Sequence, residues 1–148
     1  MKKNLNDLPL FELFLDFGIG NDWIDIHNDY YCEKVIIDNS KEVSLIFQFS
    51  KNKIDVKYNN LCLYFVDYKI INFTYEWWDG VEAREENLIF NPGNFTDYGC
   101  LFNLSKCRFF DEQNKIIDID NFGRKCFMLE FQEQIFEILS MNTFIEIY

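Results

Sequence analysis

The sequence lacks a long hydrophobic run. Its densest apolar stretch, residues 61–66, ends at Asp67 and is far shorter than the roughly 20 residues that a membrane-spanning helix needs. The first residues also lack the apolar stretch of a signal peptide, because Asn4, Asn6 and Asp7 lie where it would have to begin. We therefore expect a cytoplasmic protein with no membrane partner.

Residues that commonly carry catalysis are scarce or scattered. The chain has one histidine, and its five cysteines include no C-x-x-C pair. A nucleophilic serine or cysteine would have to use His27 as its base, and no catalytic motif or phosphate-binding loop surrounds a candidate. The cysteines are Cys32, Cys62, Cys100, Cys107 and Cys126. We expect reduced, mostly buried thiols, no cofactor or resident metal, and no enzymatic activity.

Basic residues are outnumbered. The chain has 14 Lys and Arg against 25 Asp and Glu, for a formal net charge of −11. This charge repels phosphate backbones, so it argues against a nucleic-acid partner and favours a basic protein partner. Residues 1–30 contain six acids against Lys2 and Lys3, and residues 76–97 contain six against Arg84. These two stretches are predicted acidic patches.

The first periodic segment predicts a short helix over residues 8–18. A proline lies in its first turn and a glycine at its end. Its apolar residues recur at helical spacing, which predicts that the helix lies across a sheet. They are Leu10, Leu13, Phe14 and Phe17. Residues 18–29 are predicted to be a loop or an extended segment.

From there the pattern changes to strands. The chain is 49% hydrophobic and 19% aromatic, which suits pleated, half-buried surfaces, and its length suits one domain over residues 1–148. The predicted strands are residues 34–37, 43–49, 54–58, 61–66, 69–75, 87–90, 101–110, 115–119, 126–132, 135–139 and 144–147. The predicted fold is mainly β (α+β), with antiparallel sheets that are sandwich-like or strongly curved and one short N-terminal helix.

Asp25, His27 and Asp29 could grip a divalent metal. Their i, i+2, i+4 spacing would place all three on one face of an extended strand. In the alternative, Ile24 and Ile26 face the core and the polar side chains simply face water. Since no second group of ligands stands out, we predict no metal site.

Residues 118–123 begin like a calcium-binding loop, with acids at the first and third positions and glycine at the sixth. The match fails at Phe122, in the fifth position, and at Leu129, where a bidentate glutamate is required. We therefore predict a hairpin turn without calcium.

Trp77 and Trp78 lie beside acids in the least regular part of the sequence. In a strand, one indole would point inward and the other outward, so one could be a core residue and its neighbour a lone surface aromatic. The surrounding acids and turn residues favour an exposed site equally well, because loops often carry function and tryptophan often anchors interfaces.

Four features of the chain together suggest a resemblance: its acidic charge, its small size, its reduced cysteines, and an antiparallel β pattern around Trp23, His27 and residues 35–49. In these features it is similar to the small immunity proteins of bacterial polymorphic-toxin and contact-dependent inhibition systems. The resemblance covers roughly the first half of the chain and rests on general character, so it assigns no role to individual residues. It implies a stoichiometric inhibitor that binds a cognate toxin.

Physical chemistry suggests which residues such an inhibitor would use. Nuclease toxins present basic clefts to phosphates, and a carboxylate-rich face with aromatic anchors can bind such a cleft. The predicted partner-binding residues are Trp77, Trp78, Asp79, Glu82, Glu85 and Glu86, with Asp22, Asp25 and Asp29 as a second patch.

Other classes of function stay open. A small-ligand module could stack a carbohydrate on Trp77 or Trp78. A metal-dependent hydrolase could use the ligands Asp25, His27 and Asp29. A scaffold subunit could pair its edge strands with a neighbour.

Overall fold

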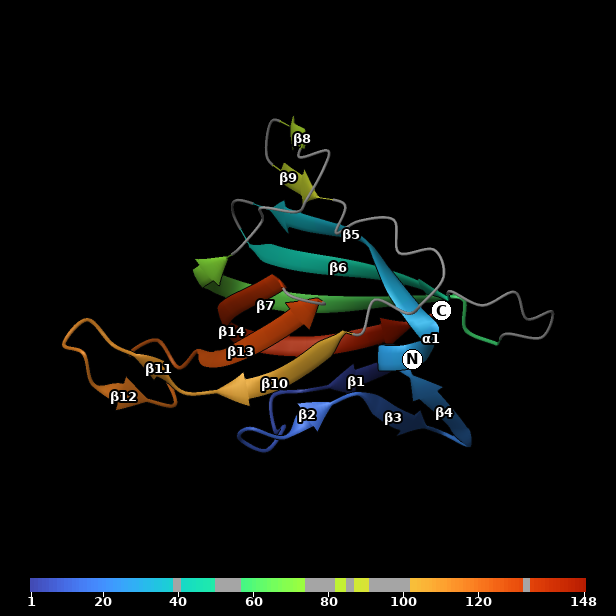
Figure 1. Ribbon diagram of the computed structural model, residues 1–148, viewed down its shortest axis with the longest axis horizontal. Coiled ribbons are helices and arrows are strands. Elements are labelled where there is room, and N and C mark those ends of the chain that lie inside the picture. The colour runs from blue at the N-terminus through green and yellow to red at the C-terminus, as the bar shows by residue number, and fades with distance from the viewer. Residues whose placement is uncertain (39–40, 50–56, 74–81, 85–86, 91–101, 132–133) are drawn as a thin grey trace.

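The computed structural model describes residues 1–38, 41–49, 57–73, 82–84, 87–90, 102–131 and 134–148 (Figure 1). For residues 73, 82–84, 87–90, 131 and 134 it describes only the backbone. The two termini lie side by side, and the Met1 ammonium donates to the Ile147 carbonyl at 3.3 Å.

Most of the described residues belong to one antiparallel sheet, in the order β2-β10-β13-β14-β7-β6-β5-β9-β8, with β1 also paired to β14. Its strands are β1 (Lys2–Asn4), β2 (Leu13–Phe14), β5 (Tyr30–Asp38), β6 (Glu42–Phe49), β7 (Asn60–Phe73), β8 (Glu82–Arg84), β9 (Asn87–Phe90), β10 (Asn103–Cys107), β13 (Lys125–Phe131) and β14 (Gln134–Ile147). The prediction of a mainly β, antiparallel fold is confirmed.

Two small hairpins lie outside this sheet. One joins β3 (Asp16–Ile19) to β4 (Asp22–Asp25) and leads into the single-turn helix α1 (Ile26–Asp29). The other joins β11 (Phe109–Phe110) to β12 (Ile116–Ile117). They lie at opposite ends of the molecule in Figure 1.

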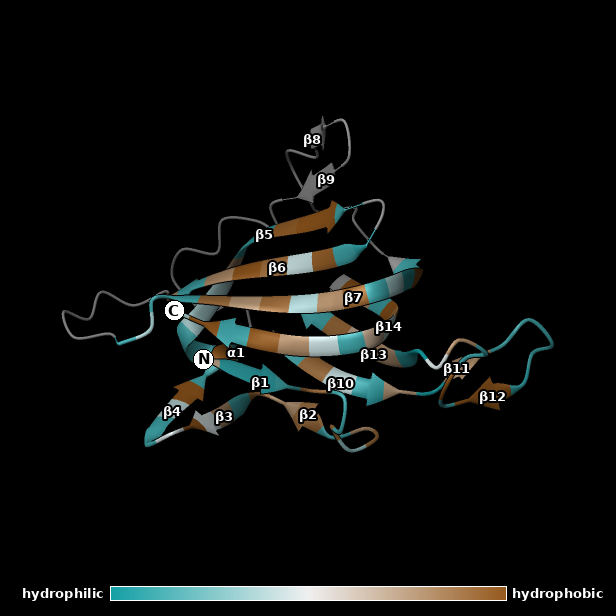
Figure 2. Cartoon of the chain, turned by 180° about the vertical axis from the view of Figure 1, so that it is seen from behind, coloured by the Kyte–Doolittle hydropathy of each residue, from teal (hydrophilic) through white to brown (hydrophobic). Residues whose placement is uncertain are grey.

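The main sheet curves over its own core. Apolar residues run along β5, β6 and β7 (Figure 2), as strands with one buried face require. Phe47 on β6 and Phe102, next to β10, are four strands apart in the sheet order, which is about 19 Å in a flat sheet. Their ring centroids are nevertheless 4.9 Å apart, and both residues are fully buried. The expected strong curvature is therefore present.

The helix predicted over residues 8–18 is wrong. Phe11 has φ 66, outside the right-handed helical region, and its N–H donates to the Lys106 carbonyl. Leu13 and Phe14 pair with β10 instead. Phe14 and Phe17 still reach the core, with ring centroids 5.2 Å apart. The apolar residues that suggested one face of a helix are thus buried from strands. Pairing with β10 outweighs the local preference of this segment for a helix.

Three of the strand predictions are confirmed. Residues 34–37 and 43–49 lie in the β5–β6 hairpin, and residues 87–90 form β9. The segments predicted as pairs of strands, 61–66 with 69–75 and 135–139 with 144–147, lie instead on the continuous strands β7 and β14 as far as the described residues extend.

One predicted strand is only partly described. Within residues 54–58, Lys57 and Tyr58 are not in a strand, and residues 54–56 lie outside the described residues.

Candidate functional site

The β3–β4 hairpin is built by a tight turn at Gly20 and Asn21. Gly20 has φ +57 and Asn21 has no positive φ, the pattern of a type II′ turn, which matches the twist of the paired strands. Phe17 and Ile24 are directly opposite each other and buried. They hold one face of the hairpin on the core, so the opposite face points to solvent.

An exposed tryptophan occupies that outer face. Trp23 is directly opposite Gly18 and 71% exposed. A Cβ at Gly18 would lie 3.3 Å from the indole, so the missing side chain lets the ring lie close to the neighbouring strand. A large exposed aromatic held in this way is a suitable anchor for a binding partner.

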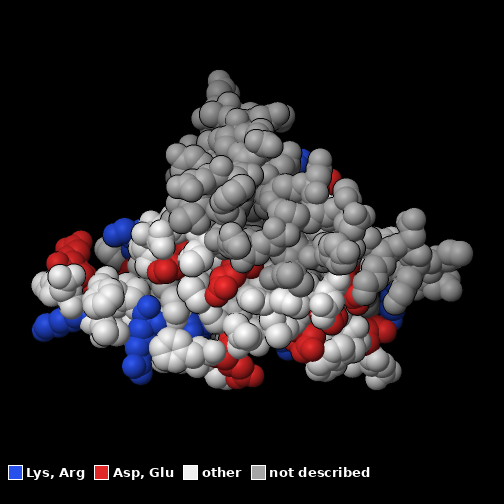
Figure 3. Space-filling model, viewed as in Figure 1, with Lys and Arg blue, Asp and Glu red and all other residues white. Residues whose placement is uncertain are grey.

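Two carboxylates lie on the same face as this indole, because Asp16 and Asp25 are directly opposite each other two pairs along the hairpin from Gly18 and Trp23. Asp25 caps α1 and accepts from the Asn28 N–H and from Asn28 Nδ2, both at 2.9 Å. Within the described residues no cation forms a salt bridge with Asp16. Figure 3 shows acidic side chains gathered around this hairpin, at the lower right.

Asp22 belongs to the other face. Its carboxylate accepts from Lys57 Nζ at 2.7 Å and from Tyr58 Oη at 3.2 Å. The Lys57 hydrogen bond holds the pKa of Asp22 below its usual value. Since its charge is compensated inside the molecule, Asp22 supports the hairpin and does not extend the outer face.

The metal-binding alternative loses its geometric basis. Residues 26–29 form α1 rather than an extended strand, so Asp25, His27 and Asp29 do not alternate on one strand face. His27 Nδ1 lies 2.9 Å from the Phe102 carbonyl, which requires a proton on that nitrogen. Among the described residues, no group of three metal-ligating atoms within 4.8 Å of one another includes any of these side chains.

Asp29 has a local electrostatic effect instead. It is half-buried and precedes the buried Tyr30. Burial, with the Asp29 charge as a smaller cause, raises the pKa of Tyr30 to about 12. The second predicted patch therefore has Asp25 on the outer face, Asp22 on the inner face and Asp29 beyond the hairpin.

The first predicted patch lies almost wholly outside the described residues. This holds for Trp77, Trp78, Asp79, Glu85 and Glu86. For Glu82 only the backbone is described, in β8, where it pairs with Ile89.

The predicted turn at residues 118–123 is present. Asp120 accepts from the N–H groups of Phe122 and Arg124 at 3.0 and 2.8 Å, and from Arg124 Nε at 2.7 Å. Gly123 has φ +87. The Asp120 carboxylate is thus occupied by hydrogen bonds within the turn itself.

The sequence did not predict two residues of the hairpin surface as partner-binding residues. They are Trp23 and Asp16. The available signal was the Gly20-Asn21 dipeptide, which favours a hairpin between the segments on either side. The helical spacing of residues 10–17 concealed it.

The chain matches no protein-family model, no curated protein and no solved structure. Within the described part of the chain, no helix has the length and apolar character needed to cross a membrane.

Proposed function

We propose that this protein is an acidic protein-binding module that neutralises a cognate toxin by stoichiometric binding to a basic surface of that toxin. The observation that supports this most directly is the outer face of the β3–β4 hairpin. There Trp23, 71% exposed, lies beside the opposed carboxylates of Asp16 and Asp25.

Each side chain has a distinct part in the proposed complex. Burial of the Trp23 indole supplies contact area and slows dissociation, as tryptophan does at interface hot spots. Asp16 and Asp25 attract a basic partner and fix its orientation, with the net charge of −11 adding long-range steering. The cap on α1 holds the Asp25 carboxylate in place.

The proposal also explains a feature that folding does not require. The exposed indole leaves apolar surface in water, and the like charges beside it oppose hairpin formation. A cationic partner that covers this face would bury the indole and compensate the two charges. The acidic residues Asp79, Glu82, Glu85 and Glu86, with Trp77 and Trp78, stay a second part of the proposed interface.

The test is affinity capture of the tagged protein from its native lysate, at low and at high salt, with the captured proteins identified by mass spectrometry. Trp23→Ala is the test variant. Phe122→Ala is the matched control, because Phe122 is an exposed aromatic, at 75%, in a turn of another hairpin region.

We expect the wild type and Phe122→Ala to capture one basic protein at low salt, less of it at high salt, and Trp23→Ala to lose it. The captured protein should be toxic when expressed alone and harmless when co-expressed with this chain. Equal capture by Trp23→Ala would exclude the hairpin face. Absence of a basic, toxic partner would overturn the proposed function.

A further inference from the structure

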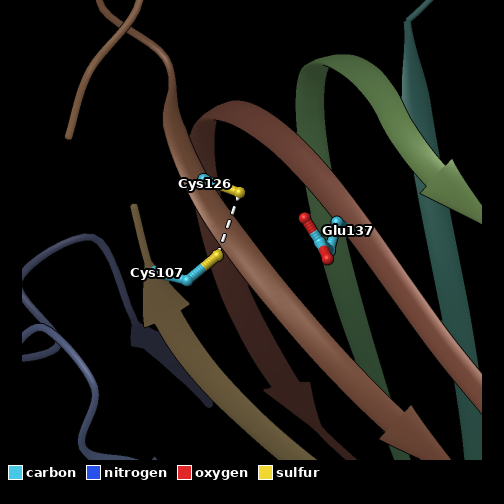
Figure 4. A group of neighbouring side chains, drawn as sticks. All are labelled: Cys107, Cys126 and Glu137. Atoms are coloured by element: carbon cyan, nitrogen blue, oxygen red, sulfur yellow. Dashed lines mark hydrogen bonds between the residues drawn. The ribbon is translucent and has the colours of Figure 1, made fainter. Parts of the chain in front are cut away.

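Two cysteines and a glutamate meet on the outer face of the main sheet, at the opposite side of the strands from the large core. Cys107, at the end of β10, and Cys126 on β13 are directly opposite each other, and their Sγ atoms are 3.1 Å apart. Glu137 on β14 is opposite Met128, the next residue after Cys126 on that face. Figure 4 shows the two thiols turned toward each other and the carboxylate of Glu137 on their side of its strand.

The three side chains are close enough to share an ion. One ligand atom from each, two sulfurs and a carboxylate oxygen, lies within 4.8 Å of the other two. Cys126 is fully buried, Cys107 is 9% exposed, and Glu137 is partly exposed. Phe109 and Leu139 complete a small apolar cluster around the thiols.

We propose that Cys107, Cys126 and Glu137 form a zinc-binding site, independent of the toxin-binding face. Thiolates are soft ligands that favour zinc, and a carboxylate is an accepted third ligand. Two thiolates and one carboxylate leave the fourth tetrahedral position to water, an arrangement that zinc accepts.

Binding is balanced by the release of protons. Zn²⁺ forms two Zn–S bonds and one Zn–O bond, and both thiols lose their protons to solvent. Because the thiolates and not the thiols bind the metal, zinc binding should weaken as the pH falls.

The geometry needs a small adjustment. At Zn–S bonds of about 2.3 Å, tetrahedral thiolates lie about 3.8 Å apart, so the sulfurs must separate slightly from 3.1 Å. Repulsion between the two thiolates favours this separation. A pocket of about 170 Å³ lies beside this cluster and shares Phe109, Ile117 and Leu139 with it.

The test is titration of the full-length protein with Co²⁺ and then with Zn²⁺, with all thiols kept reduced by a phosphine. Test variants are Cys107→Ser, Cys126→Ser and Glu137→Gln. Cys62→Ser is the matched control, since Cys62 is another buried thiol, on β7 and outside the cluster. Circular dichroism checks that each variant is folded.

We expect one equivalent of Co²⁺ to give thiolate-to-cobalt charge-transfer absorption, and Zn²⁺ to displace it, in the wild type and in Cys62→Ser. The two cluster serine variants should lose the absorption. Loss of a residue that only hydrogen-bonds to a metal ligand typically weakens metal binding roughly 10–100-fold. Since Glu137 is proposed as a direct ligand, Glu137→Gln should weaken zinc binding by at least that factor.

Three results would overturn the site. One is the absence of cobalt–thiolate absorption in the reduced wild type. Another is unchanged zinc affinity in the folded Glu137→Gln variant, which tests the proposal even if a serine variant fails to fold. The third is a Cys107–Cys126 disulfide formed with oxidised glutathione in a protein whose reduced form binds no zinc, which would make the pair a redox pair instead.

Discussion

Asp16 and Asp25 are directly opposite each other on the outer face of the β3–β4 hairpin. Like charges in this position destabilise a strand pair, on the scale of the roughly 0.2–1 kcal/mol that cross-strand pairs contribute. Only Asp25 also caps α1. Substitutions at the two positions can therefore distinguish the destabilisation by charge repulsion from the stabilisation by the helix cap.

Replacing Asp16 by Asn should stabilise the protein. The substitution removes the repulsion at similar size, so we expect the free energy of unfolding to rise by about 0.5 kcal/mol at low salt and by less at high salt. Asp25→Ala removes the same repulsion but also the cap, which is typically worth about 1 kcal/mol, and should lower stability. Urea unfolding at two salt concentrations measures both. A gain from Asp16→Asn that salt does not change would refute the electrostatic explanation.

The turn of the hairpin should be more sensitive to alanine than the strand beside it. Gly20→Ala forces a side chain into φ +57, where nothing crowds a Cβ but the backbone is strained by roughly 1–2 kcal/mol. Gly18→Ala has an ordinary φ and needs only a small shift of the Trp23 indole. We therefore expect thermal unfolding to show a larger loss for Gly20→Ala. Equal losses would mean that contact with Trp23, rather than the turn, limits the hairpin.

The sequence predicted the sheet well where a strand has one buried face. Val35, Ile37, Val43 and Leu45 alternate with partly exposed residues on paired strands, so their period of two is visible in one dimension. The helix prediction for the N-terminal segment is wrong because Phe14 and Phe17 are three residues apart, a spacing that a helix and two consecutive short strands can both bury.

The predicted breaks inside the long strands failed for a different reason. Residues 140–143, which the prediction left between two strands, include the polar Ser140, Asn142 and Thr143. In the fold, Ser140 Oγ donates to the Val66 carbonyl at 3.1 Å, and the Thr143 N–H donates to Asn6 Oδ1 at 2.9 Å. Val66 and Asn6 are distant in sequence, so no local pattern could show that the Ser140 hydroxyl and the Thr143 N–H bond to them.

The candidate sites also depend on strand pairing that a local sequence pattern does not show. Asp22 and Asp25 were predicted as one patch from proximity in sequence, but strand alternation and the β3–β4 pairing place them on different faces. Cys107 and Cys126 were expected to be buried, which is confirmed. Their pairing depends on the β10–β13 register, and composition does not determine that register.

Asn6 should be important for stability although its side chain is small. Its Oδ1 accepts from the buried Thr143 N–H at 2.9 Å, and its Nδ2 donates to Asn142 Oδ1 at 3.0 Å. Asn6→Ala leaves that N–H without its partner, so we expect a loss of about 1–3 kcal/mol in urea unfolding. Asn121→Ala, at an exposed position, is the control and should stay within about 0.5 kcal/mol. Similar losses in both variants would argue against the specific role of Asn6.

The ion pair of Asp120 and Arg124 should make stability depend on pH. Their atoms are 2.7 Å apart and the side chains are only 13% and 14% exposed. Burial alone would raise the pKa of Asp120, but the hydrogen bonds from Arg124 and Phe122 outweigh it and leave the pKa below its ordinary value. A carboxyl whose pKa is lower in the folded state contributes stability above its unfolded pKa of about 3.9, and this contribution is lost as the pH falls through the folded pKa.

Asp120→Asn should therefore cost about 1.5–3 kcal/mol at pH 7, the range for hydrogen bonds to charged groups, and progressively less below about pH 4. The matched control is Asp118→Asn, because Asp118 pairs with Arg108 at 2.9 Å but both side chains are more than half exposed. That surface pair should contribute at most about 1 kcal/mol. Urea unfolding at pH 7, 5 and 3 measures both variants. If Asp120→Asn cost the same at all three pH values, the charge of Asp120 would have no part in the stability of this turn.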